Sequence, residues 1–197
     1  MQPQTQVKRG LKRAVYDREQ INQILDDTYL CHIGGVVDGY PAVQPNLHWR
    51  IGDTLYIHGS SKNGLINAIL TEGKTCITVS ALDGIVFAKS AFHHSVNYRS
   101  VMLFGTPKLV EDEQEKREAL DALLEKFKKG RSKETRPPNA TEMKATSVIA
   151  ISLEHVSAKV RATGPEDDPA DLDLPFTSGV LPIHQVYGEF EPFDPNA

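Results

Sequence analysis

Two tight-turn signals divide one apolar stretch of the sequence, and they constrain the fold more than any other feature. The stretch runs from Tyr29 to Gly59 and reads YLCHIGGVVDGYPAVQPNLHWRIGDTLYIHG. Asp38-Gly39 and Gly52-Asp53 interrupt it, and such dipeptides are typical of the short loops that join antiparallel strands. The stretch therefore predicts three antiparallel strands. We place them at residues 29–36, 41–49 and 53–59.

Several further strand patterns follow this stretch. They are KTCITVSAL, the residues after Asp83-Gly84 and SVMLFG, with Asp83-Gly84 interpreted as another turn; SVIAISLEHVSAKV is a late strand that follows the third helical segment described below. Five or six short strands with tight turns, interrupted by one helix, indicate a closed or nearly closed small barrel. The expected fold class is mainly β with flanking α-helices.

Three segments have helical patterns. The first follows a capping signal at Asp17 and ends near Asp26. The second has Ser60 or Ser61 as its N-cap and is closed by Gly73. The third is DEQEKREALDALLEKFKKG at 112–130, which has acidic residues at its start, lysines at its end and an apolar stripe between.

The charge distribution suggests three parts. Residues 1–15 carry four cationic side chains and few apolar ones, so we expect a flexible basic arm. Residues 16–163 form the barrel domain, and 164–197 form a loop and tail whose first part is acidic and rich in proline.

Composition excludes several classes of protein. The 197 residues have a net charge of −4, which argues against a nucleic-acid partner. No apolar run is long enough for a membrane span and no secretory signal begins the chain, so we expect a cytoplasmic protein. Cys31 and Cys76 lack metal-site spacing, and we expect both to be reduced and buried.

The segment HGSSKNG, from His58 to Gly64, has a local pattern suited to phosphate. A strand that ends in small hydroxyl residues and leads into a helix presents free amides at the positive end of the helix dipole. Lys62 adds a full positive charge. The alternative is an ordinary helix cap with a solvated lysine. The spacing of a Walker loop is absent.

The segment FHHSVNYRSV contains two adjacent histidines ahead of a strand. In an extended chain His93 and His94 point to opposite faces, so they are poorly placed to bind one metal ion, and we expect no metal site. Tyr98 and Ser100 share one face of the predicted strand and Arg99 takes the other. The strand offers these groups to an anionic ligand, or its polar residues simply cap neighbouring loops.

The order of these pieces resembles a known family. The strings CHI, DGYPAVQP, GDTLYIHGSSKNG, LDGIVFAKSAFHHSVNYRSVMLFGTPKLVED and EKREAL, in this order, are similar to the FMN-binding split barrels of the pyridoxamine 5′-phosphate oxidase-like superfamily. The resemblance is to the flavin-nucleotide-binding branch, which is related to the nitroimidazole-resistance reductases. It covers residues 10–160 and GVLPI at 179–183.

This resemblance implies a split-barrel homodimer with FMN at the subunit interface. Ser60, Ser61 and Lys62 match the phosphate site, and Val43, Gln44, Pro45 and Asn46 match the strand beside the flavin ring. Tyr98, Arg99 and Ser100 match a strand that supplies further polar contacts, with the histidine pair at the mouth of the flavin cleft. The C-terminal GEFEPFDPNA lacks the arginines of true pyridoxamine phosphate oxidases, so that reaction is not expected.

The function that follows from the resemblance is reduction or oxidation of a small molecule by bound FMN, with NADH or NADPH as the candidate electron donor. No catalytic residue is identified, because hydride transfer to a flavin requires no acid or base from the protein. The alternative is a non-catalytic flavin- or haem-binding module of the same fold. A haem would need an axial ligand. The candidates are His32, His48, His58, His93, His94 and His184.

Overall fold

The computed structural model describes residues 5–194 and contains two compact units. The first unit comprises residues up to Ala81 together with Tyr98–Arg161. The second comprises Leu82–Asn97 and the residues from Ala162 onward. The barrel belongs to the first unit, and the unit boundaries cut across two of its long strands.

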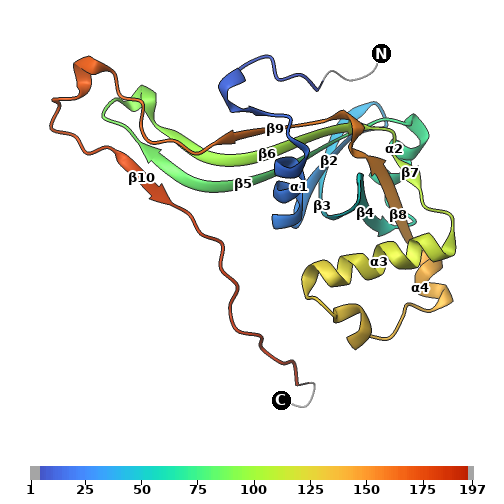
Figure 1. Cartoon of the computed structure of the whole chain (residues 1–197). Helices are drawn as coiled ribbons and strands as arrows, with labels where there is room; N and C mark the ends of the chain where they lie inside the picture. The colour runs from blue at the N-terminus through green and yellow to red at the C-terminus, as the bar shows by residue number, and fades with distance from the viewer. Residues whose placement is uncertain (1–4, 195–197) are drawn as a thin grey trace. The chain divides into compact units, whose positions relative to one another are not determined.

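The first unit is built on an antiparallel β-barrel (Figure 1). In sheet order its strands are β9 (Val156–Arg161), β6 (Ser95–Gly105), β5 (Thr75–Phe87), β2 (Leu30–Val37), β3 (Tyr40–Ile51), β4 (Thr54–Ser60) and β8 (Thr146–Ser152). The short turn Leu153–His155 joins β8 directly to β9, so the two ends of this path are connected and the strands form a ring. The predicted split-barrel fold class is confirmed.

The first two predicted hairpins are present. Asp38 and Gly39 both have positive φ, 50° and 81°, which matches the type I′ turn that suits a two-residue hairpin. Leu30 pairs with Leu47 and the ladder continues to Val37 opposite Tyr40. Gly52, with φ 56°, makes the turn between β3 and β4. The three strands were correctly predicted to within about two residues at each end.

The predicted turn at Asp83-Gly84 is wrong. Strand β5 continues through both residues, and β10 (Gly179–Pro182) pairs antiparallel with its last part. A Cβ placed on Gly84 would lie 3.1 Å from the carbonyl oxygen of Leu181. Glycine is therefore needed here because another strand approaches closely, not because the chain turns.

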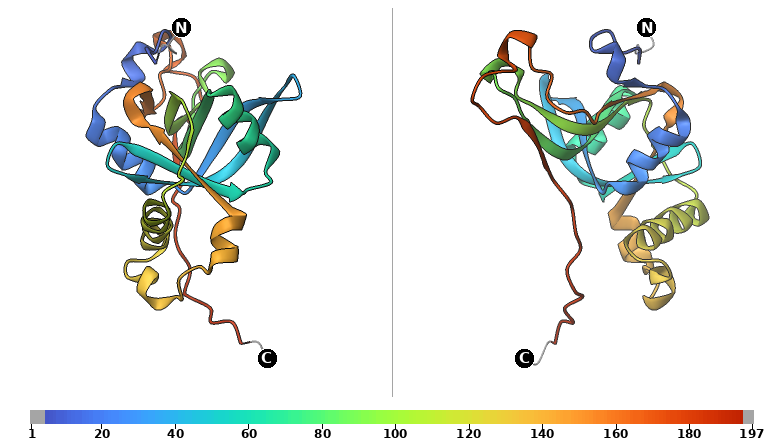
Figure 2. Two further views of the ribbon diagram at one scale, coloured as in Figure 1. Left: turned by 90° about the vertical axis from the view of Figure 1, so that its right-hand side faces the viewer. Right: turned by 60° about the vertical axis from the view of Figure 1, so that its left-hand side comes forward.

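Two of the predicted helices have aspartate N-caps, and the first of these, Asp17, was predicted. Asp17 Oδ1 accepts a hydrogen bond from the Gln20 amide at the start of α1 (Arg18–Asp27), and Asp112 accepts one from the Glu115 amide at the start of α3 (Glu113–Phe127). The sequence did not predict α4 (Ala140–Ala145), which lies with α3 next to β8 (Figure 2). None of the helices in the described chain has both the length and the apolar character needed to cross a lipid bilayer.

The N-terminal segment takes part in the sheet. Strand β1 (Ala14–Val15) pairs antiparallel with β9, so this end of the expected flexible arm is hydrogen-bonded to the barrel. Residues 1–4, which the same prediction included, lie outside the described residues. The other peripheral strand, β7 (Lys108–Leu109), pairs with β8.

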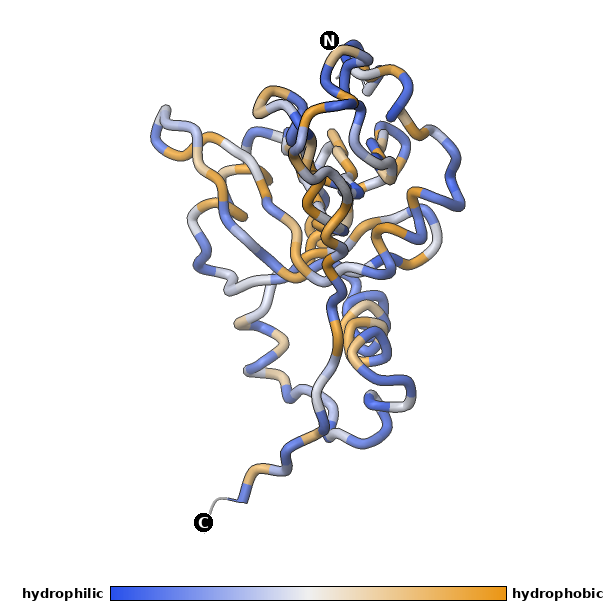
Figure 3. The backbone as a smooth tube through the Cα atoms, turned by 90° about the vertical axis from the view of Figure 1, so that its left-hand side faces the viewer, coloured by the Kyte–Doolittle hydropathy of each residue, from blue (hydrophilic) through white to orange (hydrophobic). Residues whose placement is uncertain are grey.

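Two apolar clusters hold the first unit together. The larger fills the barrel and is closed by α1 and by α2 (Gly64–Glu72); Figure 3 shows the hydrophobic stretches of the strands that line it. Its helical members are Ile21, Ile24, Leu25, Leu65, Ile66 and Ile69. The smaller cluster packs Trp49 and Tyr56 against Ala119 and Leu123 of α3.

The two cysteines differ in exposure. Cys31 is fully buried, as predicted, and burial raises the pKa of its thiol to about 12, which keeps it protonated and unreactive. Cys76 is only partly buried. Both thiols are free.

The second unit is organised around Lys89. Its backbone amide donates to Asp167 (2.6 Å), and its Nζ donates to the carbonyl oxygens of Leu174 (2.5 Å) and Phe176 (3.0 Å). The acidic, proline-rich loop is therefore tied down within this unit. Beyond β10 the described tail has no regular secondary structure.

Candidate functional site

The structure brings two of the predicted groups together, one on β3 and one at the end of β4. Asn46 Nδ2 donates to the carbonyl oxygen of His58 (2.8 Å), and Asn63 Nδ2 donates to Gln44 Oε1 (3.2 Å). These bonds fix Val43–Asn46 beside residues Ser60–Asn63. We call Ser60–Asn63 the β4–α2 turn. The two segments form one surface that ends at the N-terminus of α2.

The N-cap of α2 is Asn63, so the prediction of Ser60 or Ser61 is wrong. Asn63 Oδ1 accepts from the Ile66 amide (3.0 Å), whereas Ser60 Oγ accepts from the Lys62 amide within the turn (3.2 Å). The turn therefore extends two or three residues further than expected before the helix begins. Gly73 closes the helix with φ 65°, as predicted.

The β4–α2 turn has the features that favour an anion. Lys62 is exposed and forms no ion pair with any carboxylate of residues 5–194. The helix N-terminus next to it has partial positive charge from its backbone dipoles. Together they can bind a phosphate group, as the residue types alone suggested.

Close packing fixes where α2 begins. A Cβ built on Gly59 would lie 2.5 Å from Ile66 Cδ1, so the end of β4 and the first turn of α2 are in direct contact. The amide of Ser61 donates to the carbonyl oxygen of Ala145, which anchors the turn on its other side (2.8 Å). The position of the turn is therefore determined by packing as well as by hydrogen bonds.

The third predicted group, on β6, lies elsewhere in the chain. Strands β5 and β2 separate β6 from β3 in the sheet. Arg99 forms an ion pair with Asp27 (2.8 Å), and Ser100 Oγ donates to the carbonyl oxygen of Lys159 (3.4 Å). Tyr98 lies opposite Arg161 in the ladder. Within one chain the side chains of Arg99 and Ser100 have their own partners, and this strand does not join the surface at β3.

The extended chain that was assumed at the histidine pair is wrong. Residues Ala91–His93 form a short 3-10 turn capped by Ser90, and β6 begins only at Ser95. His93 Nε2 lies 3.2 Å from an Asp168 oxygen, and His94 Nδ1 lies 3.0 Å from the carbonyl oxygen of Ser90. Ser90 caps the turn because its hydroxyl accepts the Phe92 amide, a local bond that competes with extended backbone.

Two further histidines are largely buried: His48 faces the barrel interior, and His58 lies against Trp49 of the smaller cluster. His48 is fully buried and its Nε2 donates to the carbonyl oxygen of Leu25 (3.1 Å); burial lowers its pKa to about 4, so the ring is neutral. The ring of His58 lies 5.7 Å from that of Trp49, and burial lowers its pKa as well. The Nδ1 atoms of both histidines are buried and have no hydrogen-bond partner in the described structure.

A cavity of about 620 Å³ in the first unit was not predicted. It lies between β2, the end of α2, the start of β5 and the end of β6. Backbone of Gly34, Gly35 and Gly105 forms part of its wall, and Cys76 and His155 contribute side chains. Glycine-rich strand ends at GGVV and FGTP were the available sequence signal, since glycine in a strand often marks a close approach.

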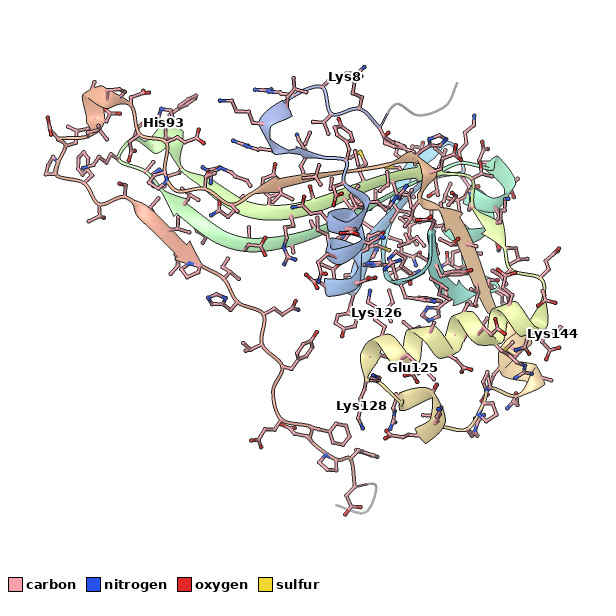
Figure 4. All side chains as sticks on the ribbon, in the orientation of Figure 1. Lys8, His93, Glu125, Lys126, Lys128 and Lys144 are labelled. Atoms are coloured by element: carbon pink, nitrogen blue, oxygen red, sulfur yellow. The ribbon has the colours of Figure 1, made fainter. Side chains whose placement is uncertain are left out.

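The cationic run at the C-terminal end of α3 is largely occupied by internal contacts. Lys126 Nζ donates to the backbone carbonyl oxygens of Leu25, Thr28 and His48. Lys128 and Arg131 both pair with Glu134 (3.1 and 3.4 Å). Figure 4 shows Lys126 and Lys128 near the end of α3. Residues 5–194 contain no cluster of three or more metal-ligating side chains.

Comparison with known proteins gives three informative structures. Flavocytochrome Anf3 from Azotobacter vinelandii is 40% identical, with a TM-score of 0.92 over 99% of this chain and 92% of that one. An FAD- and haem-binding protein from Mycobacterium smegmatis is 34% identical, with a TM-score of 0.87 over 94% and 90%. A 5-nitroimidazole antibiotic resistance protein from Bacteroides thetaiotaomicron is 25% identical, with a TM-score of 0.63 over 75% and 86%.

The sequence family is also defined. No curated protein sequence gives a significant match to the chain. The family model for pyridoxamine 5′-phosphate oxidase matches residues 17–160, which is well over half of the chain and includes β2 to β8. With the two structures that are at least 34% identical over nearly the full length, this match shows that the chain belongs to the pyridoxamine 5′-phosphate oxidase-like family.

Proposed function

We propose that this chain is a flavin- and haem-binding electron-transfer protein. The observation that carries the proposal is the near full-length similarity to two proteins, one named a flavocytochrome and the other an FAD- and haem-binding protein. This favours the alternative that the sequence left open over a simple FMN-dependent reductase. The name of the second protein also favours FAD over FMN as the flavin.

The surface formed by β3 and the β4–α2 turn fits the flavin. Lys62 and the α2 N-terminus would hold a phosphate, and the backbone of Val43–Asn46 would lie beside the ring system. Bound flavin supplies one- and two-electron redox chemistry, while the protein orients it and controls its access to solvent. Val43 is 70% exposed, which leaves an apolar surface available for such a ring.

Among the histidines, His155 is the best candidate for a haem ligand, because it lines the 620 Å³ cavity. A haem needs an apolar cavity and a histidine with a free ring nitrogen. His155 lines the cavity and has no hydrogen-bond partner among the described residues, and Phe104 supplies an aromatic wall. His48 is excluded because its ring is buried in the core and its Nε2 is already bonded.

A homodimer remains part of the proposal. Leu30, Val36 and Val43 lie on the outer face of β2 and β3 and are 58%, 49% and 70% exposed. A neighbouring copy would cover these side chains and remove apolar surface from water. Light scattering on the purified protein would test this, and a monomer at micromolar concentration would contradict it.

The absorption spectrum of the purified protein tests the main proposal. We expect flavin bands together with a Soret band, and release of FAD and haem on denaturation, identified by mass. In His155→Ala the Soret band should be lost or shifted, whereas His184→Ala, which changes an exposed histidine, should leave it unchanged. Flavin without haem, combined with rapid reduction by NADH or NADPH, would instead support the small-molecule reductase.

Replacing Lys62 tests the flavin site directly. We expect Lys62→Ala to weaken flavin binding by about tenfold or more, because a charged hydrogen bond to phosphate is lost. Fluorescence titration of the flavin-free protein would measure this. Lys108→Ala removes another exposed lysine, from β7, and should leave the affinity unchanged. Equal affinity in Lys62→Ala and the native protein would rule out this role for Lys62.

A further inference from the structure

The C-terminal tail, which we define as residues 183–194, exposes large apolar side chains. The Ile183 amide donates to the carbonyl oxygen of Asp83 (3.0 Å), directly after β10. The rest of the described tail, red in Figure 1, has no helix or strand. Four of its apolar side chains are 76–89% exposed: Val186, Tyr187, Phe190 and Phe193. Apolar side chains grouped in this way normally mark a surface that binds a partner.

The tail also has a negative charge. Glu189 and Glu191 alternate with its aromatic residues, and the chain has no lysine or arginine after Arg161. Neither glutamate forms an ion pair or a side-chain hydrogen bond with residues 5–194. Pro192 restricts its own φ and favours an extended conformation at Glu191, which lowers the entropy cost of binding. The tail is therefore suited to a surface that is both basic and apolar.

Residues 11–16 near the N-terminus form such a surface, and we call them the docking segment. Leu11 and Tyr16 are 66% and 54% exposed. Lys12 and Arg13 lie between them, and their side chains form no ion pair or hydrogen bond with residues 5–194. Strand β1 lies in this segment and pairs with β9, so the segment has a fixed position on the barrel. Its cations and exposed apolar groups complement those of the tail.

We propose that the tail of one chain binds the docking segment of a second copy of this chain. Within a single chain the apolar side chains of both segments remain exposed, and a second copy would cover them. Exchange of a terminal segment between identical chains is a low-cost route to a dimer. The twelve residues of the tail can span roughly 40 Å when extended, which is enough to reach a neighbouring subunit. The inference rests on the homodimer proposed above and assigns part of its interface.

Two charge-reversal variants of the full-length protein test this contact. Glu189→Lys/Glu191→Lys makes the tail basic, and Lys12→Glu/Arg13→Glu makes the docking segment acidic. Each homodimer should dissociate at a concentration about tenfold higher than the native dimer, or more, because like charges then face each other. In a mixture of the two variants each tail meets a segment of opposite charge, so a heterodimer of native affinity should form. Sedimentation velocity with a fluorescent label on one variant measures both effects.

A third variant with the same change in net charge provides the control. Glu118→Lys/Asp121→Lys reverses two exposed acids on α3 and should change the dissociation constant of the dimer by less than about threefold. Equal weakening by this variant, or a mixture that fails to recover native affinity, would overturn the proposal. A native dimer that tolerates both reversals would overturn this inference alone, whereas a monomeric native protein would also overturn the homodimer. Matching melting temperatures and flavin content would verify that the variants are folded.

Photo-crosslinking locates the contact. With Phe190 replaced by the photoreactive residue p-benzoylphenylalanine, irradiation should produce a species of twice the chain mass. Mass spectrometry should then place the link on the docking segment of the second copy. The assignment would be wrong if no link joins two chains, if the link stays within one chain, or if it reaches only other parts of the second copy.

Discussion

Replacement of Lys126 by methionine is expected to lower the free energy of unfolding by about 3 kcal/mol. Lys126 Nζ donates to the carbonyl oxygens of Leu25 (3.0 Å), Thr28 (2.5 Å) and His48 (3.0 Å). It also lies 5.4 Å from the centre of the Tyr29 ring. Methionine keeps much of the apolar stem but removes one donor from each of these carbonyl oxygens, of which that of Leu25 retains the His48 Nε2 donor.

The expected loss is large because Lys126 joins three elements. Leu25 and Thr28 lie at the C-terminal end of α1, where the helix dipole favours a cation, and His48 lies on β3. Lys126 itself belongs to α3, about one hundred residues later in the chain. A single ammonium group therefore replaces the C-terminal cap of α1 and attaches α3 to the barrel.

Urea unfolding at neutral pH measures this effect. Burial lowers the pKa of Lys126 to about 8, so the ammonium group is still mostly charged under these conditions. Lys129→Met changes an exposed lysine three residues away and should alter stability by less than about 0.5 kcal/mol. If both variants unfold at the same urea concentration, the three hydrogen bonds contribute nothing measurable.

Lys126 also shows where sequence reasoning fails. It stands in a run of cations after an amphipathic helix, and such a run normally marks a solvated helix end. The neighbours Lys128 and Arg131 fit that interpretation, since both are exposed at their ion pair with Glu134. Nothing local distinguishes Lys126 from them. Its role depends on carbonyl groups that only the tertiary fold brings within reach.

Local chemistry explains why the first hairpins were predictable. Asp38-Gly39 needs two positive φ angles, and few residue pairs accept them, so the turn is specified by the sequence itself. Asp83-Gly84 has the same letters but lies inside a continuous strand, because β10 pairs with it from a segment nearly one hundred residues later. A dipeptide cannot report whether a distant strand will occupy its hydrogen bonds.

The candidate site also has parts that could be predicted from the sequence and parts that could not. Ser60–Lys62 and Val43–Asn46 could be located because a strand, a turn and a helix cap are local patterns, and the family resemblance supplied their role. The N-cap moved to Asn63 because its side chain serves both the helix and Gln44, a contact across two strands. The cavity lined by His155 could not be predicted, since its walls come from elements that meet only after the barrel closes.

Acid should destabilise this protein through His48. The side chain is fully buried, and burial is the main cause that lowers its pKa from 6.5 to about 4, with the charge of Lys126 second. The unfolded chain then binds a proton near pH 6.5, whereas the folded chain does so only near pH 4. Neutral His48 therefore contributes to the free energy of unfolding fully above pH 6.5, and this contribution is lost as the pH falls. The loss amounts to about 3 kcal/mol at pH 4.

Urea unfolding between pH 7 and pH 4 would measure this loss, with His48→Gln as the test variant. Glutamine keeps an amide donor for the carbonyl oxygen of Leu25 but cannot take up a proton, so its stability should fall less steeply over the same range. His184→Gln removes an exposed histidine and should retain the native slope. Because Lys126 lies against the same carbonyl oxygen, removing its charge should raise the pKa of His48 and shift the loss of stability to higher pH. Parallel slopes in the native protein and His48→Gln would show that other groups cause the acid sensitivity.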